Sequence, residues 1–299
     1  MKCQGLKFLT KNKAFFILGF LVFLVIFSLY NIHERRKSRE FVPLSSPPVV
    51  SPSSSNLFVN SQPQDFQPIF DKVIFSGPTN KRVVAFSFDA DMTPFMKRQL
   101  EKGRIKSYYN KEVIKILREK AVPATLFLTG LWAEKYPEVV KELSEDPLFE
   151  IGNHSYSHPA FAYPCFKLPP VNSKQKNEEI GQAQEVLKKI IGYYPHLFRF
   201  PGGCYEKSDL AITKKYGLTV VHWNVDSEDA FNASTQKIVE NVKKEVKPGA
   251  IIVFHLNGNK NAPKTAEALP EVINYLKKQG YSFVKISDLL KQENLEKAI

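Results

Sequence analysis

The sequence is poor in cysteine. Its 299 residues include only three, Cys3, Cys165 and Cys204, which is too few for a small scaffold held together by disulfides. Cys165 and Cys204 can in principle pair, but two thiols so far apart in sequence are more often unpaired, and we expect no disulfide between them. The chain also has no internal repeat and no nucleic-acid-binding motif, which argues against a repeat array and against a protein that binds DNA or RNA.

Acidic residues are scarce relative to basic ones. The sequence has 42 Lys and Arg against 30 Asp and Glu, a net charge of +12. Such an excess suits an anionic surface, such as a cell-wall polymer or a phospholipid face, and charge alone would also suit nucleic acid. Apolar residues, in contrast, are plentiful: 43% of the chain is hydrophobic and 12% aromatic. This is enough for one large core, so the protein is not a disordered one.

The N-terminal region contains one long hydrophobic run. Residues 14–32 form an almost unbroken apolar stretch of 19 residues, and a helix of that length roughly spans the ~30 Å hydrocarbon core of a bilayer. A cleaved signal peptide is the alternative, but its apolar region is usually about 7–15 residues long and ends at a small-residue cleavage site. No such site follows here, so we predict an uncleaved transmembrane signal anchor, with residues 1–13 as a short cytoplasmic segment.

The next segment, residues 33–79, is rich in proline and serine. This composition cannot bury enough apolar surface to form a core, and it predicts an extended linker. From residue 80 to 299, short β-rich runs alternate with amphipathic stretches. We expect strands at 82–88, 124–129, 149–153, 196–200, 219–224, 250–255 and 282–285, and helices at 111–120, 137–144, 177–191, 208–216, 234–246, 262–279 and 286–298. Such alternation predicts an α/β fold with a parallel sheet, and about seven units close naturally into a (β/α) barrel.

Two histidines lie four residues apart in the stretch Asn-His-Ser-Tyr-Ser-His-Pro. On one helical turn, His154 and His158 would lie on the same side, where two neutral ring nitrogens can converge on a cation. The same spacing also occurs by chance in surface or half-buried pairs, and the pattern alone does not decide. Because the chain has only six histidines and other polar residues stand at the ends of predicted strands, we favour a metal site.

Two acids stand at the end of the first long predicted strand. Asp89 and Asp91 leave a buried strand, where an unpaired carboxylate carries a large desolvation cost. A division of labour fits both, with one acid binding a metal and the other acting as a general base beside it. A single Asp there would more simply cap the following turn. Two acids in a chain that also carries the histidine pair indicate a metal site.

Other polar residues follow later strands. Arg199 precedes a Pro-Gly-Gly turn, where a fixed guanidinium could orient a carboxylate and bare backbone N–H groups could face an oxyanion. The alternative is an ordinary turn beside a surface arginine. His255 ends an apolar strand and could act as a general acid if an Asp raised its pKa, although a lone histidine there is more often a satisfied core residue. An acid at 226–229 could hold such a partner.

The motifs FDAD, NHSYSHP, RFPGG, VDSED and IIVFH follow one another over about 170 residues. In content and order they resemble the polysaccharide deacetylases, the NodB homology domain of carbohydrate esterase family 4. The resemblance implies a distorted (β/α) barrel over residues 80–299 and a hydrolase that uses a divalent metal, most often Zn²⁺, with Co²⁺, Ni²⁺ or Mn²⁺ as alternatives. Members remove acetyl groups from N-acetylglucosamine polymers such as peptidoglycan or, less often, from O-acetylated xylan.

The resemblance also implies roles for individual residues of this sequence. Three would bind the metal: Asp91, His154 and His158. Four would act in catalysis: Asp89 as the general base, His255 as the general acid, Arg199 beside the base and Asp229 beside the acid. Two would face the oxyanion or the substrate: Gly202, through its backbone N–H, and Tyr205. Attack by a metal-activated water would release acetate and leave a free amine.

Three positions depart from the family pattern. Ala90 separates Asp89 from Asp91, which are adjacent in most members, Ala230 replaces the usual tryptophan, and Val253 stands where a leucine often lines the acetyl pocket. These departures motivate an alternative of another class, a glycan-binding barrel that has lost catalysis. An enzyme of this family would meet its glycan outside the cell. We therefore expect a single-pass membrane protein with an extracytoplasmic catalytic domain, whose partners are an acetylated glycan polymer and the membrane, and no nucleic acid.

A basic stretch at residues 96–110 contains five Lys and Arg and two adjacent tyrosines. On the active face of a barrel it could hold a polyanion and stack a sugar ring. A solvated helix followed by a turn is the simpler interpretation, and it is the one that we expect.

Overall fold

The computed structural model describes residues 66–77, 81–232 and 234–296. The predicted cytoplasmic segment 1–13, the predicted anchor 14–32 and most of the predicted linker lie outside these residues. Within the described ranges, no helix is both long and apolar enough to cross a bilayer.

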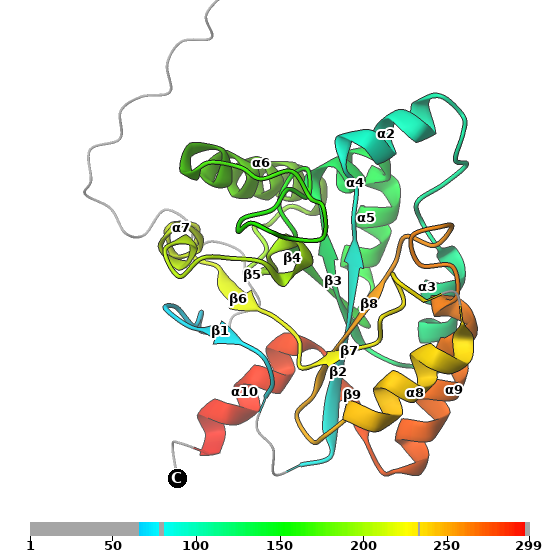
Figure 1. The fold of residues 1–299 in the computed structure, drawn as a ribbon. Coiled ribbons are helices and arrows are strands. Elements are labelled where there is room, and N and C mark those ends of the chain that lie inside the picture. Colours follow the sequence, from blue (N-terminus) through cyan, green and yellow to red (C-terminus); the bar gives the residue numbers. More distant parts are fainter. Residues whose placement is uncertain (1–65, 78–80, 233, 297–299) are drawn as a thin grey trace, which may run out of the picture. The chain divides into compact units, whose positions relative to one another are not determined.

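The strands form one curled sheet in which neighbouring strands run parallel (Figure 1). They are β1 (Val73–Ile74), β2 (Val83–Ala90), β3 (Ala124–Leu128), β4 (Phe149–Asn153), β5 (Leu197–Phe198), β6 (Thr219–Val221), β7 (Val225–Asp226), β8 (Ile251–His255) and β9 (Ser282–Val284). Their order is β1-β6-β5-β4-β3-β2-β8-β7, and β9 pairs with the start of β2. The expected α/β fold with a barrel-like parallel sheet is confirmed, although β1 and β7 were not predicted.

Helices follow most of the strands. They are α2 (Pro94–Glu101), α3 (Lys111–Glu119), α4 (Gly130–Lys135), α5 (Pro137–Glu145), α6 (Ser173–Ile191), α7 (Asp209–Lys215), α8 (Thr235–Glu245), α9 (Thr265–Lys278) and α10 (Ile286–Glu296), with a short 3₁₀ turn, η1 (Pro201–Gly203). The longest, α6, begins at a capping box formed by Asn172 and Gln175 and ends at Gly192, whose φ of 89° suits glycine. Each predicted helix is present with shifted ends, α2 lies where a helix was expected in the basic stretch, and α4 is additional.

The segment from β6 to β7 connects the two ends of the curled sheet. The predicted strand 219–224 is not one continuous strand. Its first part, β6, pairs with β5 and β1, and the segment then continues to β7, which pairs with β8 on the other side of the sheet. Between them, the N–H of His222 donates to the carbonyl of Ile74 at 2.7 Å, and the N–H of Asn224 donates to the carbonyl of Ile251 at 3.2 Å. Figure 1 shows this yellow segment running from β6 to β7. It completes the distorted barrel where a regular strand pair is absent.

Strand β2 separates two apolar clusters. All eight of its residues are buried, so its sequence alternates between two cores rather than between core and solvent. Phe86 and Phe88 lie in the outer core under the helices, while Ala85 lies in the inner core with Leu289 of α10. Burying one phenylalanine side chain fully stabilises the folded state by roughly 1.5–3 kcal/mol relative to leaving it exposed to water. The same alternation turns the side chain of Asp89 to the inner face, where the barrel opens.

Residues of the predicted linker take part in the fold of the domain. Residues 66–77 fall in the range that we assigned to the linker, yet β1 pairs with β6. The N–H of Ile69 also donates to Thr219 Oγ1 at 2.8 Å. The apolar pair Val73 and Ile74 explains the difference, because it completes one edge of the sheet and packs on its cores. The domain boundary therefore lies before residue 80.

The two distant cysteines are joined. Cys165 and Cys204 form a disulfide with a Cα–Cα distance of 6.1 Å, across 39 residues of sequence. Our expectation of unpaired thiols was wrong because sequence separation says little about distance once the fold places two loops together. Here the loop at 160–170 lies against η1.

The basic stretch 96–110 is largely as expected. It begins in α2, which Thr93 caps, and continues into a turn. Tyr108 differs from the expectation because its side chain is buried and its carbonyl accepts from Trp132 Nε1 at 2.8 Å.

Candidate metal centre and active site

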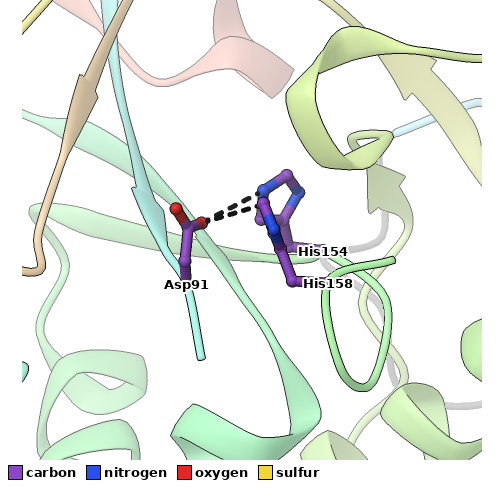
Figure 2. A group of neighbouring side chains, drawn as sticks. All are labelled: Asp91, His154 and His158. Atoms are coloured by element: carbon purple, nitrogen blue, oxygen red, sulfur yellow. Dashed lines mark ion pairs between the residues drawn. The ribbon is translucent and has the colours of Figure 1, made fainter. Parts of the chain in front are cut away.

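Three side chains converge at the carboxyl ends of β2 and β4. Asp91 Oδ1 lies 3.4 Å from His154 Nε2 and 3.3 Å from His158 Nε2. Figure 2 shows Asp91, just after β2, facing both imidazole rings. One candidate ligand atom from each residue lies within 4.8 Å of the others. This grouping is what the sequence predicted for the metal site.

The two histidines do not share a helical turn. Residues 154–158 form a loop, in which Ser155 (φ 67°) and His158 (φ 61°) have left-handed backbones. The side chain of Asn153 accepts from the N–H of Ser155 at 2.8 Å, and Ser155 Oγ accepts from the N–H of His158 at 3.1 Å. The expectation of a helix was therefore wrong. A proline after His158 and these local side-chain bonds favour a turn, which still brings both rings to one side.

The donor atoms fit a divalent cation. His154 Nδ1 lies 2.8 Å from the carbonyl of Arg199, so it carries the proton and leaves Nε2 bare. Asp91 Oδ1 and His154 Nε2 are both buried without a hydrogen-bond partner, which is costly unless a ligand satisfies them. Burial lowers the pKa of His158 to about 4, so its ring is neutral. Burial tends to raise the pKa of Asp91, but the neighbouring histidines outweigh it and keep this carboxyl ionised.

Asp89 is paired with a buried arginine. Arg199 Nη1 donates to Asp89 Oδ1 at 2.7 Å, and Nη2 donates to Ser87 Oγ at 2.8 Å. Arg199 has no exposed surface, and burial lowers its pKa although Asp89 opposes this effect. The other oxygen, Asp89 Oδ2, lies on the side of the candidate metal ligands, 3.6 Å from His154 Nε2. One oxygen is thus fixed and the other is free to accept a proton.

His255, on the strand beside that of Asp89, forms a second pair. Its Nδ1 lies 2.7 Å from Asp229 Oδ1, and its backbone N–H donates to Asp229 Oδ2 at 2.8 Å. Thr265 Oγ1 donates to the same Oδ2 at 2.5 Å. Burial would lower the pKa of His255, but Asp229 raises it to about 10. The ring is therefore an imidazolium, and its Nε2 lies 3.9 Å from Asp91 Oδ2.

The Pro-Gly-Gly turn also reaches the cleft. Gly202 lines it together with Asp89 and His255. Gly202 has φ 60°, and a Cβ there would lie 2.8 Å from Cys165 Sγ, so both its backbone and its surroundings require glycine. Tyr205 departs from the expectation: it is not among the residues that line the cleft, because its ring stacks on Phe200 at 5.2 Å.

Comparison with known proteins agrees with this geometry. A family profile described as polysaccharide deacetylase matches residues 76–221. A peptidoglycan-N-acetylglucosamine deacetylase of Bacillus cereus is 31% identical over 219 residues, which cover 72% of this chain and 70% of the relative. The chain belongs to the polysaccharide deacetylase family. Members of this family are hydrolases that act on N-acetyl amide bonds.

Two further relatives cover most of the family domain. A peptidoglycan-N-acetylmuramic acid deacetylase of Bacillus subtilis is 29% identical over 248 residues, which cover 79% of this chain and 84% of the relative. A crystal structure of a peptidoglycan N-acetylglucosamine deacetylase superposes with a TM-score of 0.63 at 28% identity, and it covers 76% of this chain and 94% of that one. The polysaccharide deacetylase fold is therefore present over the described barrel.

The deacetylase cleft is small. Its volume is about 340 Å³, at the lower end of the ~300–1,000 Å³ typical of ligand sites. Ala230 and Val253, two of the positions that depart from the family pattern, both line it. Their small side chains leave room beside the candidate metal ligands. The third, Ala90, is buried at the end of β2, and Asp91 still reaches the cluster past this spacer.

Some supporting residues were not predicted. Asn257, fully buried, accepts from the N–H of Asp91 at 3.0 Å and donates to its carbonyl at 2.6 Å. Glu179 of α6 accepts from the N–H groups of Tyr156 at 3.0 Å and Ser157 at 2.7 Å. Asn257 is two residues beyond His255 and thus on the same side of an extended chain, which was a usable signal. Nothing in the helical pattern of α6 singles out Glu179.

Proposed function

We propose that the protein is a metal-dependent N-deacetylase of a cell-wall polysaccharide, with peptidoglycan as its substrate. One observation carries this proposal: the group of Asp91, His154 and His158 adjoins both a paired acid, Asp89, and a paired imidazolium, His255. All of these side chains except His154 line one cleft. Amide hydrolysis needs a base for the water and an acid for the leaving nitrogen. Asp89 and His255 supply both from neighbouring strands, β2 and β8, where they are cross-strand partners beside the cation site.

The chain's own residues account for the proton transfers. A divalent metal held by Asp91, His154 and His158 would polarise the acetyl carbonyl and lower the pKa of a water molecule. Asp89, oriented through Arg199, takes the proton of the attacking water on its free Oδ2. The Gly202 N–H donates to the developing oxyanion. His255 gives its Nε2 proton to the departing nitrogen, and Asp229 stabilises the imidazolium before this transfer.

Zn²⁺ is the metal that we propose. Two neutral imidazole nitrogens and one carboxylate oxygen are ligands that zinc prefers, and such a set leaves positions open for water and substrate. Co²⁺, Ni²⁺ and Mn²⁺ accept similar ligands and would compete according to availability.

The polymer is proposed from charge and from the relatives. All three named relatives are peptidoglycan deacetylases, and a net charge of +12 favours an anionic wall polymer. We further propose that residues 14–32 anchor the protein in the membrane and that the catalytic domain is extracytoplasmic. The disulfide between Cys165 and Cys204 supports this location, since such bonds persist in oxidising compartments.

Acetate release from the purified full-length chain tests the function. The substrates are N-acetylglucosamine oligomers, peptidoglycan and O-acetylated xylan, each with added Zn²⁺ and with a chelator. His154→Ala and Asp89→Asn should abolish release. Asp71→Asn, a matched change at an acid that pairs with Lys214 at the surface, should not. Bound Zn²⁺ without release from any substrate would refute the enzyme and favour the glycan-binding barrel. Release from xylan alone would correct the substrate.

A further inference from the structure

Two exposed phenylalanines stand at the edge of the catalytic cleft. Among the described residues, six large hydrophobic side chains are exposed. Two of these, Phe166 (63% exposed) and Phe231 (64% exposed), line the cleft together with Asp91 and His255. Apolar surface in contact with water carries a free-energy cost, and where it gathers beside a reactive centre it marks a ligand-binding surface.

The two rings form one surface. The centroids of Phe166 and Phe231 are 5.4 Å apart and their planes differ by 29°, an offset stack. The contact joins distant segments, the loop at 160–170 and the turn after β7, so the fold creates it. Because each side chain remains nearly two-thirds exposed in spite of the stack, most of the aromatic surface is left free for another molecule.

Phe166 is held in place by a braced loop. The N–H of Ala160 donates to the carbonyl of Pro169 at 2.9 Å and closes the loop at its base, and the adjacent Cys165 is covalently bound to Cys204. Phe166 has φ 42°, a left-handed conformation that a bulky residue keeps only when its surroundings impose it. A side chain held in this way and still left in solvent serves something other than the core.

Phe166 contacts the turn that contains Gly202, and Phe231 lies close in sequence to the partner of His255. A Cβ on Gly202 would lie 3.0 Å from Phe166 Cδ2, so this ring packs directly on the Pro-Gly-Gly turn, η1. Phe231 follows Asp229, the partner of His255, by two residues. The stacked pair therefore lines the same cleft as Gly202 and His255, the two groups that would contact the acetyl carbonyl and the leaving nitrogen.

We propose that Phe166 and Phe231 form a sugar-stacking platform that binds the pyranose ring next to the acetylated residue. This inference rests on the proposed function. The C–H groups on one face of a pyranose carry partial positive charge and suit the negative face of an aromatic ring. A cleft of about 340 Å³ encloses little more than one sugar residue, so the neighbouring residue must lie at its edge, where the platform is. The platform makes the enzyme selective for polymers over short glycans.

Chain-length dependence tests this platform. The full-length enzyme and its Phe166→Ala, Phe231→Ala and double variants are compared on N-acetylglucosamine dimers and hexamers. We expect KM for the hexamer to rise about tenfold in each single variant and the dimer to change much less. Because the two rings act as a unit, the double variant should be little worse than either single one. Phe95→Ala is the matched control, since Phe95 is 61% exposed but does not line the cleft.

Phe166→Tyr and Phe231→Tyr keep the aromatic face, so their KM for the hexamer should stay close to that of the wild type. This comparison separates a loss of stacking from a defect in folding. An unchanged hexamer KM in the alanine variants would overturn the platform, and so would equal losses on dimer and hexamer. If the wild type releases no acetate from any glycan, the proposed function fails. The platform is then tested by measuring how tightly the protein binds the hexamer. Hexamer affinity, measured by calorimetry, should then fall about tenfold in the alanine variants, and equal affinities would refute the platform.

Discussion

Replacing Asp229 by asparagine should move the alkaline limb of the pH–rate profile. Asp229 Oδ1 accepts from His255 Nδ1, while Oδ2 accepts from the backbone N–H of His255 and from Thr265 Oγ1. An asparagine has one oxygen only. If that oxygen serves the backbone and the hydroxyl, the amide NH₂ faces His255 Nδ1 and two donors oppose each other. Asp229→Asn thus removes both a negative charge and an acceptor from the imidazolium.

The size of the effect follows from the pKa of His255. Asp229 raises this pKa to about 10 against the effect of burial. Without the carboxylate, only Asp91 and Asp89, which act more weakly, still oppose the effect of burial, and we expect the pKa to fall to about the ordinary value of 6.5. At pH 8 the protonated fraction then drops from about 99% to about 3%. Activity needs the imidazolium and is lost as pH rises through this pKa, so the rate at pH 8 should fall about thirtyfold from its acidic plateau.

Acetate release measured between about pH 5 and about pH 11, as kcat/KM, reports the pKa in the free enzyme. A cation beside Asp91 would lower the pKa of His255 in both proteins, so the displacement between their profiles is the quantity to compare. Thr265→Val is the control because it removes one hydrogen bond from Asp229 but keeps its charge, and its limb should stay within about one pH unit of the wild type. Coincident limbs in the wild type and Asp229→Asn would refute His255 as the acid.

Other changes test the supporting contacts. Arg199→Met should lower the free energy of unfolding by about 3–5 kcal/mol, because it leaves Asp89 buried without its counter-charge; a loss below about 1 kcal/mol in urea unfolding would contradict a buried pair. Glu179→Gln should weaken Zn²⁺ binding roughly tenfold, since one amide oxygen cannot replace a carboxylate that accepts three hydrogen bonds from the loop between the histidines; an unchanged Kd in competition with a chelating dye would argue against this. Serine at both Cys165 and Cys204 should cost about 2–4 kcal/mol, because the bridge closes a loop across 39 residues; equal thermal unfolding of the variant and the oxidised wild type would exclude that contribution.

The strand-end residues could be predicted because a strand fixes the direction of its own side chains. β2 and β8 are apolar runs in which every second residue faces inward. Asp89 and His255 are cross-strand partners in their parallel pairing. The carboxyl ends of parallel strands meet at one edge of a sheet, so acids and histidines placed there converge whatever the loops do.

The closure of the barrel could not be predicted in the same way. The run 219–226 alternates apolar residues such as Val221 and Trp223 with polar ones and has no glycine or proline to interrupt it. Its division into β6 and β7 is set by partners far away in sequence: Ile74 at one edge and Ile251, whose N–H donates to Asn224 Oδ1 at 2.9 Å, at the other. Local propensity carries no information about which strand lies opposite, so one long strand was the natural prediction.

The loops of the site present the same difficulty more sharply. The loop between the histidines takes its shape from Asn153 and Glu179, and the platform loop takes its position from Cys204. Glu179 and Cys204 lie far in sequence from the loops that they hold, whereas Asn153 directly precedes its loop. Sequence periodicity describes an element and not the contact between two elements. It therefore indicated the polar residues at strand ends but missed Glu179 and the bond from Cys204, which position the loops. The exposed Phe166 illustrates the consequence, because a side chain that looks like an ordinary loop residue becomes part of the cleft only when the disulfide brings its loop onto η1.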